Sequence, residues 1–105
     1  GDMTVSKNRF SAFLPGASDL AEQLRERGIE NVIITGTLTN VCCESSARDA
    51  MMRNFNVIMA SDGNATYSDV LHNASLNSLA ITFADVMTTD EILTRLTARA
   101  AEAAE

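Results

Sequence analysis

Residues 31–50 read NVIITGTLTNVCCESSARDA. The opening run, residues 31–35, is apolar and typical of a buried strand, whereas residues 41–53 carry apolar side chains at helical spacing. Cys42 therefore falls on the first turn of a helix, just past the carboxyl end of a strand, where α/β sheets present reactive groups. Unpaired N–H groups and the positive end of the helix dipole stabilise a thiolate at such a position. We therefore interpret Cys42 as a nucleophile.

Strand-like and helix-like segments alternate along the chain. The expected strands are residues 3–6, 31–35, 56–60 and 85–87. The expected helices are residues 17–27, 41–53 and 68–83, followed by a last helix that Thr89 and Asp90 cap and that frays from residue 100 onward. Because the strands are apolar on both faces, this alternation predicts an α/β fold, a parallel sheet with helices on both faces.

Two of the helices are expected to turn apolar stripes toward the core. The stripe residues are Cys43, Ala47, Ala50 and Met51 in the first of these helices, and Leu76, Leu79, Ala80 and Phe83 in the second. The third strand is expected to end at Ala60, because residues 61–64 (SDGN) are turn formers. Asn64 and Tyr67, in the following loop, could approach either a functional site or a neighbouring subunit.

Composition limits the class of function. Hydrophobic residues make up 46% of the chain and charged residues 21%, which is ordinary for a folded domain. A net charge of −6 without a basic stripe argues against nucleic-acid binding. No apolar run is long enough to cross a membrane, and the first four residues do not resemble a signal peptide, so we expect a cytoplasmic protein.

Each candidate residue also has a purely structural interpretation. A cysteine at a helix start is often a small buried residue, which is how we interpret Cys43, one position further round the helix. A disulfide between Cys42 and Cys43 would be strained. Lys7 taken alone would be a solvated surface lysine. His72, the only histidine, has no cysteine or carboxylate at ligand spacing, so we expect it at the surface or in the core rather than on a metal.

Three segments together are similar to a known family: residues 7–13 (KNRFSAF), 36–42 (GTLTNVC) and 47–50 (ARDA). They resemble the isochorismatase-like cysteine hydrolases, and the resemblance runs from Met3 to about Leu96. It implies a Rossmann-like fold of three layers. The amidase members of that family use an Asp–Lys–Cys triad, and the resemblance implies such a triad for this protein.

The resemblance also assigns roles to individual residues. Cys42 matches the nucleophile, and Lys7 matches the lysine of the triad. The peptide bond before Leu38 matches a cis bond that, in the family, aims the amides of Leu38 and Cys42 at the oxyanion. Phe10 and Phe13, close behind Lys7, are expected either to line the substrate pocket or simply to pack. No cofactor is implied, and the metal ligands of metal-binding members fall outside the matched segments.

The chain departs from the family in length. Family members are nearly twice as long, so residues 1–105 are expected to be the C-terminal portion of a single domain. The triad aspartate ends the family's first strand, and the first two strands would lie between the Lys7 segment and strand 31–35. We therefore expect either a missing N-terminal segment that accompanies this chain as a separate or cleaved chain, or a truncated product. The isolated chain would then be inactive and poorly folded, because its sheet would lack the two strands between the Lys7 segment and strand 31–35.

The function that the resemblance implies is hydrolysis of a small amide, carbamoyl or ureido compound through a thioester on Cys42. One alternative is vinyl-ether hydrolysis of the isochorismate type, which needs no cysteine nucleophile, so Cys42 counts against it. The other is a non-catalytic interaction protein that has lost the aspartate. Family members usually form dimers or tetramers, so a homo-oligomer is expected by analogy.

Overall fold

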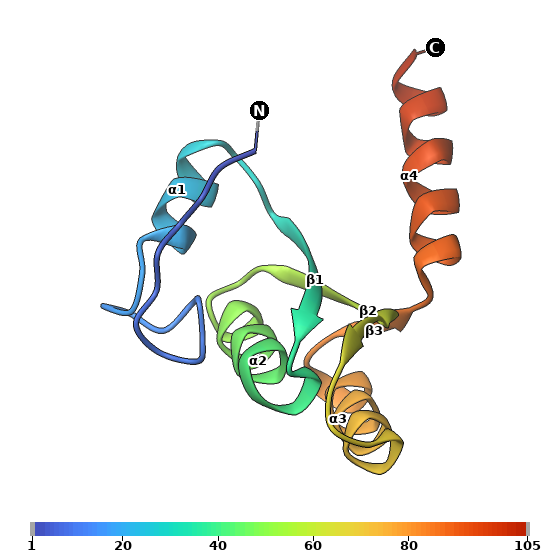
Figure 1. Ribbon diagram of the computed structural model, residues 1–105. Helices are drawn as coiled ribbons and strands as arrows, with labels where there is room; N and C mark the ends of the chain where they lie inside the picture. Colours follow the sequence, from blue (N-terminus) through green and yellow to red (C-terminus); the bar gives the residue numbers. More distant parts are fainter. Residues whose placement is uncertain (1, 105) are drawn as a thin grey trace.

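The sheet at the centre of the protein is parallel and has three strands (Figure 1). The computed structural model describes residues 2–104. The strands are β1 (Asn31–Thr37), β2 (Asn56–Ala65) and β3 (Asp85–Met87), which lie side by side in that order. The helices are α1 (Leu20–Glu26), the π-helical turn η1 (Thr39–Cys43), α2 (Glu44–Met52), α3 (Asp69–Thr82) and α4 (Thr89–Ala104). Helices connect the strands because parallel neighbours require a long crossover.

Helices lie on both sides of this sheet, which confirms the predicted fold class (Figure 1). α2 and α3 pack against the face that carries Val57 and Met59, and this contact forms the main core. Ala60, which follows Met59 along β2, points to the opposite face of the sheet. On that other face, Ile92 of α4 packs with Ala60 and Met87 in a smaller core.

Most of the predicted core stripes are confirmed. Buried or partly buried members of the main core are Cys43, Ala47, Ala50, Met51, Leu76, Leu79 and Phe83. The assignment of Ala80 to the core is wrong, because this residue is exposed. Ser75 occupies the inward position instead. Its hydroxyl donates to a carboxylate oxygen of Glu44 at 2.6 Å, so a polar contact sets the orientation of α3.

Residues 3–6 do not form the predicted strand. A strand needs a hydrogen-bonded neighbour, and no segment within residues 2–104 pairs with them. The helix predicted from residue 17 also begins later, at Leu20. The reason is local, since the Ser18 hydroxyl donates to the carbonyl of Ala12 at 2.7 Å and so holds this stretch in the loop.

Three elements extend further than predicted, and the first of them is β1, which continues from residue 35 to Thr37. β2 runs through the turn-forming residues to Ala65 instead of ending at Ala60. α4 is helical as far as Ala104 rather than frayed from residue 100, consistent with the helix preference of alanine and glutamate; residue 105 lies outside the described residues. No helix within residues 2–104 is long and apolar enough to cross a membrane.

Asn64 allows β2 to continue through this turn-forming sequence. The register jumps here, because Ile34 pairs with Met59 but Gly36 pairs with Asn64. The buried amide group of Asn64 donates to the carbonyl of Ile34 at 3.0 Å and to that of Ala60 at 2.7 Å. These two bonds bridge the bulge, and pairing between the strands resumes beyond it. Asn64 therefore has a structural role in β2.

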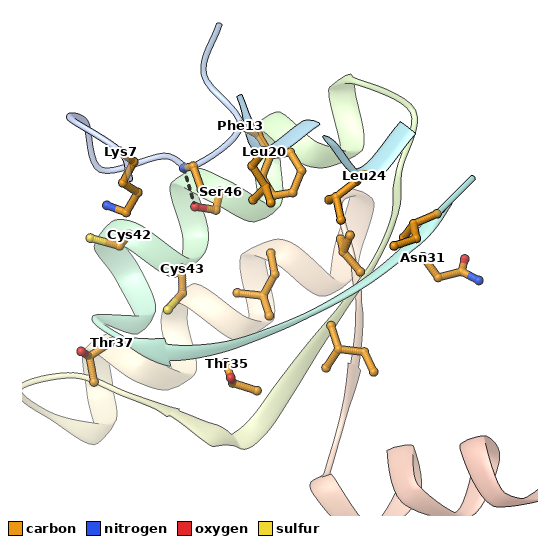
Figure 2. Close-up of a pocket in the computed structure, with 15 residues that line it drawn as sticks. Lys7, Phe13, Leu20, Leu24, Asn31, Thr35, Thr37, Cys42, Cys43 and Ser46 are labelled. Carbon is orange, nitrogen blue, oxygen red and sulfur yellow. Dashed lines mark hydrogen bonds between the residues drawn. The ribbon is translucent and has the colours of Figure 1, made fainter. Parts of the chain in front are cut away.

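β1 lies at one edge of the sheet, and a cavity of about 550 Å³ runs along it (Figure 2). The opposite wall consists of α1 and the segment that carries Lys7 and Phe13. Within residues 2–104, β1 pairs only with β2, and Ile33 of β1 is 41% exposed. A strand with an unpaired edge therefore faces an apolar hollow in the protein.

Candidate active site

Cys42 lies near the end of η1, the short turn that connects β1 to α2. The amides of Val41 and Cys43 both donate to the carbonyl of Leu38, at 3.1 and 3.2 Å, and so close a wide turn around Cys42. The peptide bond between Thr37 and Leu38 is cis, as the resemblance implied. Turns of the π type occur frequently at functional sites. The partly exposed thiol of Cys42 thus stands at the N-terminal side of α2.

Lys7 approaches Cys42 from the opposite wall of the cavity. Figure 2 shows the ammonium group of Lys7 and the sulfur of Cys42 near one another at one end of the hollow, and both residues line it. The ammonium group donates to the carbonyl of Arg9 at 2.8 Å. Neither of the two ion pairs found within residues 2–104 involves Lys7. Its positive charge is therefore available to a thiolate on Cys42.

Ser46 of α2 holds the helix that follows Cys42 against the segment that carries Lys7. Its hydroxyl accepts a hydrogen bond from the amide of Ala12 at 3.0 Å, drawn as the dashed line in Figure 2. Ser46 follows Cys42 by one helical turn, and Ala12 follows Lys7 along the other wall. The sequence indicated no role for Ser46, because a serine within a helix carries no signal of a partner 34 residues away.

The two predicted pocket phenylalanines lie in different places. Phe13 is 4% exposed, lines the cavity and packs against Phe55 with ring centroids 5.3 Å apart. It therefore combines the packing and pocket roles that the sequence left open. Phe10 is 66% exposed and is not among the residues that line the cavity beside Cys42.

Cys43 belongs to the core, as predicted, and both cysteines are free thiols. Burial raises the pKa of the Cys43 thiol above its ordinary value, and a charge on Cys42 adds to this rise while Lys7 opposes it. A thiol of this kind stays protonated and is a poor nucleophile. Of the two neighbours, Cys42 is therefore the one positioned for chemistry.

Among residues 2–104, no side chain that lines the cavity is positioned to accept the proton of Cys42. The ionisable lining residues, within the part of the chain that the structure describes, are Lys7, Cys42 and Cys43. Glu44 is close in sequence, but its carboxylate is bound by Arg48 at 2.9 Å and by Ser75. Over the same residues, no group of three histidine, cysteine or acidic side chains could hold a metal ion.

His72 occupies a position that the sequence did not indicate. It is partly buried, and its ring bonds with Thr39 of η1 on one side and with the carbonyl of Ser61 in β2 on the other. It is therefore neither a free surface side chain nor an apolar core residue. Isolated in a helical stretch, a histidine has no sequence signal for partners on two other elements.

Comparison with known proteins identifies the family of this chain. The isochorismatase domain model matches residues 1–91. Nicotinamidase 3 of Arabidopsis thaliana is 40% identical over 91 residues, which cover 87% of this chain and 45% of the relative. The ureidoacrylate amidohydrolase of Pseudomonas savastanoi pv. phaseolicola is 35% identical, over 90% of this chain and 38% of the relative.

A solved structure agrees as well. The cysteine hydrolase from Pseudomonas syringae pv. phaseolicola superposes with a TM-score of 0.84 at 37% identity, over 92% of this chain and 50% of that chain. The chain therefore belongs to the isochorismatase family, whose named relatives here are hydrolases and amidases. It spans about half the length of the curated relatives that it matches.

Iodoacetamide is expected to alkylate Cys42 of the native protein at least about tenfold faster than Cys43, because the Cys42 thiol is partly exposed, whereas the Cys43 thiol is buried and its pKa is raised. Peptide mass spectrometry after timed labelling measures both rates. In denaturant the two thiols should react alike, which provides the control. Equal labelling in the native protein would contradict the assignment.

Proposed function

We propose that this chain supplies the nucleophile and the cation of a cysteine amidohydrolase that acts on a small amide, carbamoyl or ureido compound. One observation carries the proposal: Cys42, at the start of α2, faces Lys7 across an otherwise largely apolar cavity. An ammonium group across the cavity supplies the positive charge that pairs with the sulfur when the Cys42 proton leaves. The names of the nicotinamidase and ureidoacrylate amidohydrolase relatives support the substrate class.

The proposed reaction proceeds through a thioester. The Cys42 thiolate attacks the carbonyl carbon, and the amides of Leu38 and Cys42 donate to the oxyanion that forms. The carbon–nitrogen bond then breaks, the leaving nitrogen takes up a proton, and ammonia or an amine departs. Water attacks the thioester, which releases the acid and returns the thiol. Val41 and Cys43 hold the turn rigid by their bonds to the Leu38 carbonyl.

The proton of Cys42 needs an acceptor from outside the described cavity lining. We propose that an aspartate supplies it, carried by a further segment of polypeptide that lies in the hollow along β1. Three observations support this segment. The outer edge of β1 is unpaired within residues 2–104, the hollow beside it is largely apolar, and the matched relatives are about twice as long. An unpaired parallel edge readily accepts another strand.

The thioester provides the direct test. The complete protein is mixed with nicotinamide, a ureido acid and an N-carbamoyl amino acid, quenched in acid, and digested for mass spectrometry. We expect ammonia release from at least one compound and an acyl adduct on the Cys42 peptide. Turnover in which Cys42 never carries an adduct, under single-turnover conditions, would remove covalent catalysis from the proposal.

A further inference from the structure

The two ring nitrogens of His72 have different partners, and this defines its hydrogen-bonding state. Nε2 lies 2.9 Å from the carbonyl oxygen of Ser61, and Nδ1 lies 2.8 Å from the hydroxyl of Thr39. A carbonyl oxygen can only accept, so Nε2 must carry the hydrogen. In the neutral ring Nδ1 is then an acceptor, and the Thr39 hydroxyl donates to it.

Thr39 is the first residue of the turn that carries Cys42, and it is fully buried. Its carbonyl accepts from the amide of Glu44, and the Ser75 hydroxyl, which donates to the Glu44 carboxylate at 2.6 Å, lies 3.4 Å from the same carbonyl. Ser75 follows His72 by three residues on α3, so both side chains lie on the same face of that helix. α3 therefore contacts both the side chain and the backbone of Thr39.

This contact reaches the reactive group through a short path. The Thr39 backbone directly follows Leu38, whose carbonyl closes the turn around Cys42. A rotation of Thr39 would therefore move the amides of Leu38 and Cys42 together with the thiol. His72 itself does not line the cavity, so it cannot touch a substrate bound there.

We propose that His72 is a positioning residue for the reaction. Its imidazole holds Thr39 through Nδ1, and Thr39 in turn holds η1 in the orientation that presents Cys42 and the two oxyanion donors to the cavity. The bond from Nε2 to Ser61 anchors the ring to β2 and fixes the tautomer. The inference rests on the proposed role of Cys42, whereas its test also has a readout that needs no turnover.

Two substitutions separate the two hydrogen bonds. In His72→Asn, the side-chain oxygen takes the place of Nδ1 and can still accept from Thr39, but the bond to Ser61 is lost. In His72→Gln, the amide nitrogen takes the place of Nε2 and can still donate to Ser61, but the acceptor for Thr39 is lost. Each variant thus gives up one hydrogen bond, so their losses of stability should be similar. Only His72→Gln releases the turn.

We measure kcat, KM, melting temperature and the rate of Cys42 alkylation on the complete protein. His72→Gln should lower kcat and the alkylation rate about tenfold, the scale of one hydrogen bond, while KM changes little. His72→Asn should stay within about twofold of wild type in both rates. Asn73→Ala, at the exposed neighbouring position, is the matched control and should leave all four quantities unchanged.

Substitutions at Thr39 keep the test decisive if a His72 variant does not fold. Thr39→Val should reproduce His72→Gln, and Thr39→Ser, which keeps the hydroxyl, should restore the wild-type rates. The double variant Thr39→Val, His72→Gln should be no slower than Thr39→Val alone. Equal losses in His72→Asn and His72→Gln would overturn the inference. If the wild-type protein hydrolyses no amide, the proposed function fails, and the alkylation rates still decide the role of His72.

Discussion

Replacing Cys42 by alanine is expected to lower kcat/KM for amide hydrolysis by roughly 10⁴-fold or more, because loss of a covalent nucleophile removes the entire thioester route. The thiol is partly exposed at the cavity and is no part of the main core, so the fold should tolerate the change. Ammonia release measures the rate, and circular dichroism establishes that the variant is folded.

Cys43→Ala is the matched control for this experiment. It removes a thiol of the same size from the adjacent position, which is buried in the core rather than partly exposed. Its melting temperature should fall because a buried side chain is shortened, while its kcat should stay close to that of wild type. Substantial turnover in Cys42→Ala, or loss of turnover only in Cys43→Ala, would contradict the proposed mechanism.

Residues 1–105 on their own are expected to hydrolyse no amide and to unfold without a sharp transition. Within the described residues 2–104, Leu20, Leu24 and Val32 face the cavity on one side, and β1 has no neighbour on its outer edge. Adding a polypeptide that fills this space should restore both cooperative melting and turnover. The unmatched half of the cysteine hydrolase from Pseudomonas syringae pv. phaseolicola is a suitable source. Calorimetry and ammonia release measure the two effects.

The same experiment separates folding from catalysis. In the added half, the aspartate that the proposed reaction requires is replaced by asparagine, which preserves shape and removes the proton acceptor. That mixture should melt as sharply as the unaltered one and still release no ammonia. Sharp melting together with turnover by residues 1–105 alone would show that the hollow along β1 needs no further segment.

The sequence predicted those parts of the fold that depend on local pattern. Residues 31–35 and 85–87 lie in strands, as expected for short apolar runs bounded by turn-forming residues. Ala47 and Leu79 are buried, as the helical spacing of the apolar residues predicted. Cys42 and Lys7 lie on facing walls of one cavity, and the resemblance suggested their pairing. The candidate site was thus predictable only where its residues form a recognisable motif.

Several features that the sequence missed depend on partners distant along the chain. Asn64 resembles a turn residue, yet its amide bridges two carbonyls and extends β2. Residues 3–6 have a strand-like pattern, but strand formation is a property of a pair. Ser46 and His72 bind groups on other elements, and nothing in their immediate neighbours marks this. Such contacts arise from tertiary structure and leave no local signal.

The unpaired edge of β1 also bears on how this chain behaves at high concentration. A parallel edge with free N–H and C=O groups does not distinguish strongly between a cognate strand and any other extended peptide. The edge that would take up the completing segment can therefore also recruit a strand from another copy of the same chain. Correct assembly and aggregation compete for one set of hydrogen bonds, and the relative concentration of the completing segment decides between them.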